Sequence, residues 1–84
     1  MNNKILVKLY VPMIEKNFEV WLPINKKLSN IVKLLVKAID EFSRGYYKPE
    51  ELPFLYNKTN AKQYDLNILL KDTDIRNGTE LILI

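Results

Sequence analysis

The sequence predicts an α+β fold in which a mixed sheet of four to five strands packs against one α-helix. Three observations predict it. Apolar residues alternate with polar ones near the start of the chain, recur every three or four positions in one central segment, and follow a turn at the end. The 84 residues form one expected domain, residues 1–84, with a small core. A single helix covers one face of a sheet, so the other face is predicted to stay open.

Two strands are predicted near the start of the chain. Residues 4–11 alternate with period two until Pro12, and residues 17–22 alternate again until Pro23. Because the connection between them is short, we expect an antiparallel hairpin. The residues expected to face the helix are Ile5, Val7, Leu9, Val11, Phe18, Val20 and Leu22.

The spacing of apolar residues then changes to that of a helix. Leu28, Val32, Leu35, Ile39 and Phe42 recur at intervals of four and three, which is typical of one amphipathic helix. We place this helix at residues 30–44. In this interpretation Ser29 is the N-cap and Gly45 adopts the left-handed conformation after the last turn.

The second half of the chain predicts shorter elements. Residues 52–56 read as a short third strand, and residues 63–70 as a further short strand, a turn or both, so the course of residues 57–70 is left open. Asn77-Gly78 favours a turn before a last strand at residues 79–84. In this order of elements the first and last strands are expected to run parallel at the centre of the sheet.

The composition argues against catalysis and bound metals. The chain has no cysteine and no histidine, and no glycine-rich phosphate loop. Asp72 and Asp74 are the one close acidic pair beside a turn, and we interpret them as caps of the turn backbone. We therefore predict no enzyme activity, no cofactor and no metal. The lack of a long apolar run predicts a soluble cytoplasmic protein without direct membrane insertion.

The order of elements is that of the β-grasp, and one motif carries a closer resemblance. Leu70-x-Asp72-x-x-Ile75-x-x-Gly78-Thr79-x-Leu81-x-Leu83 resembles the turn and final strand of ubiquitin relatives, although many of them carry an aromatic residue at the position of Thr73. The chain is most similar to the small bacterial ubiquitin-like proteins of the YukD/EsaB kind. That resemblance implies an accessory or regulatory component of a type VII (WXG-type) secretion system.

The glycines bear on how such a protein acts. Ubiquitin-like carriers use a flexible tail ending in Gly-Gly, whereas the glycines here are Gly45 and Gly78, both assigned to turns. The sequence thus predicts a non-conjugating adaptor that binds protein partners. The resemblance implies as partner the cytoplasmic part of a secretion membrane component or an ATPase, and a second copy of the chain is the other option.

The predicted open face supplies the candidate binding residues. Alternation sends aromatic and aliphatic side chains, with little charge, to the side away from the helix. The predicted protein-binding residues are Leu6, Lys8, Tyr10, Trp21, Leu55, Ile82 and Ile84. The competing interpretation is that these side chains only cover the sheet.

The alternative function is a basic β-grasp domain that binds nucleic acid or another acidic partner. The excess positive charge lies in the first half of the chain, where Lys26, Lys27, Lys33 and Lys37 could form a basic strip. The net charge is only +3, with arginine at positions 44 and 76 alone, so we expect no strong nucleic-acid binding.

Overall fold

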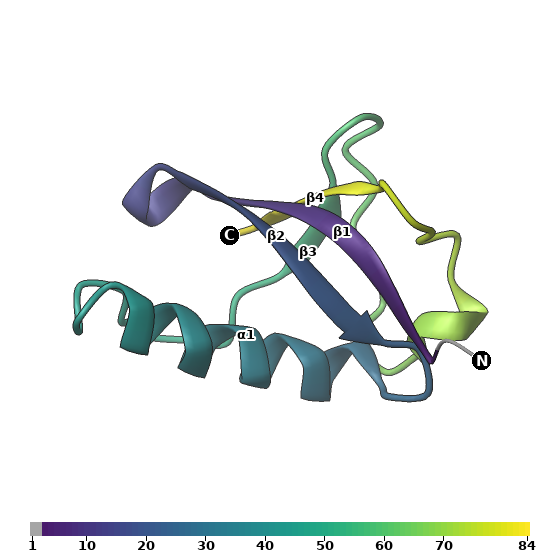
Figure 1. Ribbon diagram of the computed structural model, residues 1–84, viewed down its shortest axis with the longest axis horizontal. Coiled ribbons are helices and arrows are strands. Elements are labelled where there is room, and N and C mark those ends of the chain that lie inside the picture. The colour runs from purple at the N-terminus through teal and green to yellow at the C-terminus, as the bar shows by residue number, and fades with distance from the viewer. Residues whose placement is uncertain (1–2) are drawn as a thin grey trace.

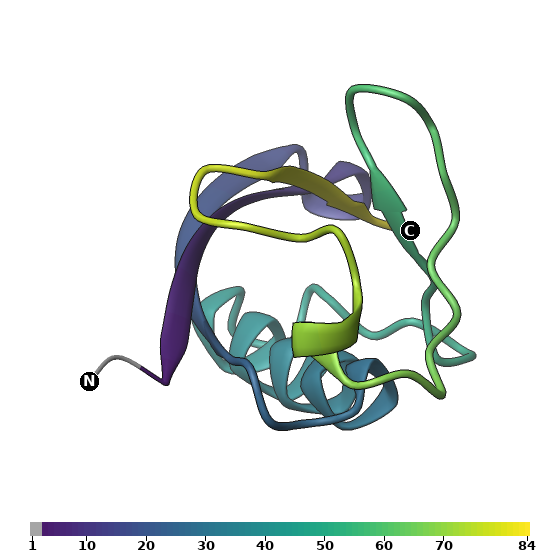
Figure 2. The ribbon, with the colours of Figure 1, turned by 90° about the vertical axis from the view of Figure 1, so that its right-hand side faces the viewer.

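The computed structural model describes residues 3–84 and contains one helix packed across one face of a four-stranded sheet (Figures 1 and 2). The strand order in the sheet is β2-β1-β4-β3. The elements are β1 (Lys4–Val11), β2 (Lys16–Pro23), α1 (Leu28–Phe42), β3 (Leu55–Asn57) and β4 (Glu80–Leu83), with short 3-10 helices at Pro12–Ile14 and Leu70–Asp72. The predicted fold class, a mixed sheet on one helix, is confirmed.

Strands β1 and β2 form the predicted antiparallel hairpin. Their register runs from Lys4 opposite Pro23 to Val11 opposite Lys16. The 3-10 helix Pro12–Ile14 makes the connection. Pro12 has no backbone N–H, and it stands in the first turn, where a backbone N–H would have no partner within the helix. The hairpin is long and continuous, so the period-two faces of both strands are fixed over their whole length.

Strands β1 and β4 lie side by side and parallel at the centre of the sheet, as predicted. Lys8 pairs with Glu80 and the ladder continues along both strands. The turn before β4 extends this contact: the Leu6 N–H donates to Asn77 Oδ1 at 2.8 Å, and the Gly78 N–H donates to the Leu6 carbonyl at 2.8 Å. Gly78 has φ +87°, a conformation that costs glycine little. The Asn77-Gly78 turn therefore locks the last strand to the first.

Helix α1 begins and ends two residues earlier than predicted. Its N-cap is Lys27, and Ser29 makes no cap. Instead, a distant loop satisfies the first turn, because the Leu28 N–H donates to the Ile68 carbonyl at 2.9 Å and the Ser29 N–H to the Leu66 carbonyl at 2.8 Å. Such tertiary capping cannot be read from the local sequence. At the other end the C-cap is Ser43, and the two residues that follow it, Arg44 with φ +55° and Gly45 with φ +88°, both adopt the left-handed region that was predicted for Gly45 alone.

The segment between α1 and β4, residues 43–79, contains less regular structure than predicted, and we call it the irregular segment. The third strand, β3, is shorter than the predicted residues 52–56; it begins three residues later, at Leu55, and ends one residue later, at Asn57. Residues 63–70 form no strand of their own; they make isolated bridges, Tyr56 with Gln63 and Lys27 with Leu69. Their backbone is used elsewhere, because the carbonyls of Leu66 and Ile68 accept hydrogen bonds from the first turn of α1.

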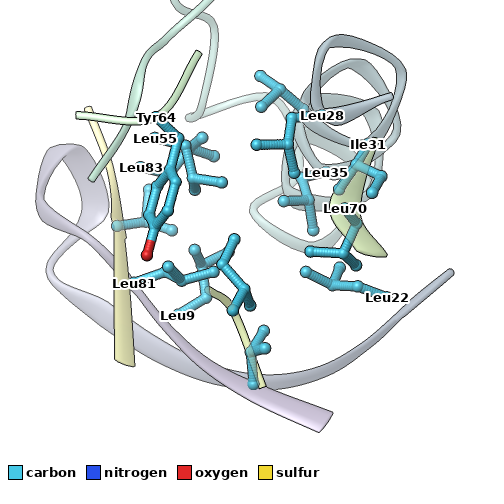
Figure 3. Close-up of a cluster of buried hydrophobic side chains, with 14 of the residues drawn as sticks. Leu9, Leu22, Leu28, Ile31, Leu35, Leu55, Tyr64, Leu70, Leu81 and Leu83 are labelled. Carbon is cyan, nitrogen blue, oxygen red and sulfur yellow. The ribbon is translucent and has the colours of Figure 1, made fainter. Parts of the chain in front are cut away.

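The core lies between the helix and the inner face of the sheet (Figure 3). Val7, Leu9 and Leu81 from the central strands are at most 1% exposed. The irregular segment also contributes, since Tyr47 and Tyr64 are both buried, although neither was predicted to belong to the core. A domain this small needs such loop residues, because helix and sheet alone bury too little apolar surface.

Leu55, the first residue of β3, and Phe54, which precedes it, test the inner and outer faces of the sheet. Leu55→Ala removes a fully buried side chain and should lower the free energy of unfolding by about 2–5 kcal/mol. Phe54→Ala is the matched control, because Phe54 is 50% exposed, and it should cost less than about 1 kcal/mol. Urea unfolding followed by circular dichroism measures both. A larger loss for Phe54→Ala would reverse the assigned faces.

Candidate protein-binding face

The face of the sheet opposite α1 is built from alternate residues of four strands. On β1 these are Leu6, Lys8 and Tyr10, since Val7 and Leu9 point into the core. The pairing register then places Trp21 beside Leu6, and Glu19 beside Lys8. We call this surface the open face. Its residues are Leu6, Lys8, Tyr10, Asn17, Glu19, Trp21, Phe54, Tyr56, Lys58, Glu80, Ile82 and Ile84.

The structure places six of the seven predicted binding residues on the open face. Leu6, Tyr10 and Ile82 are half-buried by their neighbours, and Lys8 is exposed. The remaining two, Trp21 at 56% and Ile84 at 62% exposure, present the largest free apolar surface among the six. The face is hollowed by an open depression of about 280 Å³ that Lys8, Tyr10 and Glu80 line with other residues. An open depression on a sheet face suits contact with a protein surface better than full enclosure of a small molecule.

The placement of Leu55 on the open face is wrong. Leu55 pairs with Leu83 in the antiparallel ladder of β3 and β4, and both are buried against the helix side (Figure 3). Side chains directly opposite each other in a ladder share a face, so Leu55 follows Leu83 into the core. The sequence offered no alternation long enough to fix this parity, because β3 has only three residues.

Sequence reasoning missed two aromatic residues of the open face. Phe54 exchanges backbone hydrogen bonds with Ile84, at 2.8 and 3.0 Å, and Tyr56 pairs with Ile82. Both follow from the burial of Leu55, since its neighbours in an extended chain point the other way. Tyr10, Ile82 and Tyr56 therefore form a continuous line across three strands, which we call the apolar row.

A second line, which we call the charged row, runs parallel to the apolar row. It consists of Glu19 on β2, Lys8 on β1, Glu80 on β4 and Lys58 directly after β3. The Lys58 N–H donates to the Glu80 carbonyl at 2.9 Å, and its Nζ lies 5.5 Å from the centre of the Tyr10 ring. The signs alternate across the sheet. Within residues 3–84 the ion pairs are Lys48–Asp40 and Lys62–Asp74, so none of these four charges is in one.

A polar cluster fastens the irregular segment at one end of the molecule. The Tyr64 hydroxyl donates to Asp74 Oδ1 at 2.8 Å and accepts a bond from Asn57 Nδ2 at 3.1 Å. Lys62 Nζ lies 3.5 Å from Asp74 Oδ2. Burial raises the pKa of Tyr64, and the hydrogen bond from Tyr64 holds the pKa of Asp74 below its ordinary value. The cluster joins two loops and has a structural role.

Thr73, which was not among the predicted caps, caps the turn beside this cluster. Thr73 Oγ1 donates to the Leu70 carbonyl at 2.7 Å and accepts from the Ile75 N–H at 3.2 Å. Asp74 instead accepts the Tyr64 hydroxyl, so it is not paired with Asp72 as a carboxylate dyad. The part of the chain that the structure describes also contains no group of three His, Cys, Asp or Glu side chains placed to hold a metal ion.

No protein-family model matches the sequence, and a search of curated proteins found no match. Solved structures do match over almost the whole chain. The ubiquitin-like domain of the Mycobacterium tuberculosis type VII secretion protein EccD1 is 13% identical, with 100% of this chain and 99% of that domain covered and a TM-score of 0.75. The chain has the ubiquitin-like β-grasp fold. The predicted resemblance to ubiquitin relatives is thereby confirmed at the level of the fold.

Two further matches show how widely this fold is used. A chain of the ESX-5 inner membrane complex matches with a TM-score of 0.79 and 18% identity over 99% of this chain, which spans only 21% of that larger chain. A chain of a toluene 4-monooxygenase complex matches with a TM-score of 0.78 and 6% identity, covering 95% of both chains. Likeness at such identities establishes the ubiquitin-like fold, and the function has to be argued from the surface.

No helix within residues 3–84 has the length and apolar character needed to cross a membrane.

The polar cluster gives the domain a pH dependence at both ends of the scale. Asp74 has a pKa below its ordinary 3.8, so its contribution to stability is present above that pH and is lost on acidification. Tyr64 has a pKa above 10.0, so its contribution is present below that pH and is lost as the solution becomes more alkaline.

Tyr64→Phe should therefore flatten both limbs of the stability profile. Urea unfolding at about pH 3, 6 and 11 measures the effect, with pH values chosen on either side of the two ordinary pKa values. The 86% exposed Tyr46 provides the control Tyr46→Phe, which should keep the acid limb of the wild-type profile. Identical acid limbs in Tyr64→Phe and wild type would contradict the role of the Tyr64–Asp74 bond.

Proposed function

We propose that this chain is a non-conjugating ubiquitin-like adaptor that binds a protein partner through the open face. The partner is a cytoplasmic part of a type VII secretion membrane component or its ATPase, and the chain acts in the cytoplasm by binding, without catalysis. The observation that carries the proposal is the exposure of Trp21, at 56%, and Ile84, at 62%, on a face that α1 leaves uncovered.

The composition of the open face supports protein recognition. Aromatic residues with aliphatic neighbours are enriched at the centres of protein interfaces, and Trp and Tyr are frequent among the residues that contribute most binding energy. Trp21 lies beside Leu6, and the apolar row of Tyr10, Ile82 and Tyr56 lies beyond the charged row. An area of this kind on a small domain fits a modest, reversible interface.

The comparisons support the choice of partner class. Ubiquitin-like domains with the same arrangement of elements occur in EccD1, a type VII secretion protein, and within a chain of an inner membrane complex. The likeness in fold makes a secretion assembly the first partner to test. The same fold in a monooxygenase complex is consistent with the broader part of the proposal, a domain that acts by associating with other chains.

The test is capture of secretion components by the purified chain and by the double variant Trp21→Ala/Ile82→Ser. Binding should weaken at least about tenfold, because both side chains would lose contact area at the centre of the interface. Neither residue is buried in the core, so the melting transition should remain cooperative. The captured proteins are identified by mass spectrometry, and the affinity of the purified pair is measured by calorimetry.

Tyr46→Ala is the matched control, since Tyr46 is 86% exposed just after α1 and does not line the groove that Trp21 shares with Leu34 of the helix. It should leave binding unchanged. If Tyr46→Ala weakens binding while the double variant does not, the interface lies beside the end of the helix and the proposal is wrong. Capture of no type VII component by the wild-type chain would remove the secretion assembly as partner.

Nucleic acid is the alternative partner. Lys26, Lys27, Lys33 and Lys37 are exposed at the helix side, whereas the open face carries Glu19 and Glu80 as well as lysines, which disfavours a phosphate-binding track there. We expect only weak binding to DNA or RNA, falling about tenfold or more between 50 and 200 mM salt. Fluorescence anisotropy with a labelled oligonucleotide measures this, and sub-micromolar affinity at the higher salt would favour the alternative.

A further inference from the structure

We propose that the open face is self-complementary, and that a second copy of this chain docks on it face to face. The two copies are related by a two-fold axis that runs along the strands, between β1 and β4. This inference rests on the proposed function because it uses the same open face, and the occupant that it assigns to that face is a second copy of the chain.

The charged row carries the argument. Across the sheet order β2-β1-β4-β3 the charges read negative, positive, negative, positive, for Glu19, Lys8, Glu80 and Lys58. Read from the other edge of the sheet, the same row is positive, negative, positive, negative, so every position has the opposite charge. A two-fold axis between β1 and β4 exchanges β1 with β4 and β2 with β3 in the facing copy. Lys8 then faces Glu80 of the second copy, and Glu19 faces Lys58 of the second copy. All four resulting contacts join opposite charges.

The charges also select this axis over the other in-plane axis. A two-fold axis along the charged row, perpendicular to the strands, would bring each residue over its own copy. Lys8 would then face Lys8 and Glu80 would face Glu80, and like charges in contact disfavour such an arrangement. The sequence of signs therefore specifies one relative orientation of the two sheets.

The apolar row is compatible with the same axis. Tyr10 on β1 and Ile82 on β4 are neighbours in the parallel ladder, so the axis brings Tyr10 over Ile82 of the second copy. Asn17 on β2 comes over Tyr56 on β3 of the second copy, which places an amide opposite a phenol hydroxyl. Tyr10 and Ile82 lie next to the axis in this row, as Lys8 and Glu80 do in the charged row, and the outer positions of both rows are polar.

The four charges are available for contacts between copies. None of them is in an ion pair within residues 3–84, and Lys58 Nζ lies over the Tyr10 ring, next to the position that the axis assigns to the second copy. Exposed ion pairs fix orientation more than they add affinity. The resulting dimer is therefore weak, and its dissociation constant rises with salt.

Trp21 and Leu6 lie outside the two rows that the dimer uses. They stand near the end of β1 at Lys4. The axis brings Trp21 opposite the segment that follows β3 in the second copy, and Leu6 opposite the turn that precedes β4. Trp21 therefore takes no part in either row of the dimer. This separates self-association from the partner binding of the proposed function, because Trp21→Ala should reduce only the latter.

The first experiment is crosslinking, which the absence of cysteine in the sequence makes clean. Glu19→Cys and Lys58→Cys are purified separately, mixed, and treated with a bismaleimide that spans about 10 Å, the distance between packed sheets. Within one copy the two positions are separated by three inter-strand spacings, or roughly 14 Å. We expect a crosslinked dimer in the mixture and little in either variant alone. Equal yields in all three samples, or no dimer in the mixture, would overturn the proposed axis.

The second experiment tests the charges by sedimentation equilibrium at protein concentrations up to about 1 mM, where weak dimers are populated. Lys8→Glu and Glu80→Lys should each weaken self-association at least about tenfold, and the double variant Lys8→Glu/Glu80→Lys should restore it. Lys33→Glu and Glu51→Lys make the same changes of net charge at other exposed positions and should have no effect. Melting curves verify that each variant folds.

The outcomes separate this inference from the proposed function. A wild-type chain that stays monomeric at the highest concentration overturns self-association, whether or not Trp21→Ala weakens partner binding. A dimer that forms and responds to the charge variants supports it even if no secretion component is captured. A dimer that Lys33→Glu disrupts as strongly as Lys8→Glu would place the interface elsewhere and overturn the inference.

Discussion

The parallel pairing of β1 with β4 is the constraint on which the rest of the structure depends. These two strands come from opposite ends of the described chain and occupy the centre of the sheet. They supply fully buried residues such as Leu9 and Leu81 to the core. Parallel neighbours require a crossover, so α1 and the irregular segment must return the chain to the starting end of β1. The Asn77 side chain then fixes where β4 begins, through its bond to the Leu6 N–H.

The same pairing creates the open face. Lys8 and Glu80 are far apart in the sequence and become neighbours only when β4 inserts between β1 and β3. Glu19 and Lys58 extend the line to the two outer strands. The backbone of this surface is held by the hydrogen bonds of the sheet. Less backbone therefore has to be ordered when an interface forms, which lowers the entropy cost of binding.

The segment between α1 and β4 compensates for its lack of regular structure with specific side-chain contacts. Tyr47 and Leu70 are buried in the core, and Tyr64 combines burial with a hydrogen bond to Asp74. The backbone of the same segment caps the first turn of α1 through the carbonyls of Leu66 and Ile68. The segment therefore covers the side of the core that the helix and the sheet leave open, and its hydrogen bonds to α1 hold the helix at its position across the sheet.

The sequence by itself determined the elements whose repeat is long enough to show a period. The alternation of residues 4–11 and 17–22 indicated both faces of the hairpin. The spacing from Leu28 to Phe42 indicated the buried side of the helix as far as Ile39, whereas Phe42, the last residue of that spacing, is 62% exposed. The absence of cysteine and histidine also removed whole classes of chemistry before any fold was considered. These properties are local, so they can be read within one segment.

Only the tertiary structure decided which side the short elements show and which residues meet. Leu55 faces the core and Phe54 the solvent because β3 takes its register from β4, and a three-residue strand has no period of its own. Tyr64 is buried because it fills space left by distant strands. The alternating charges of Glu19, Lys8, Glu80 and Lys58 became a single row for the same reason, since side-by-side neighbours in a sheet are set by hydrogen-bond register between segments that lie far apart in the chain.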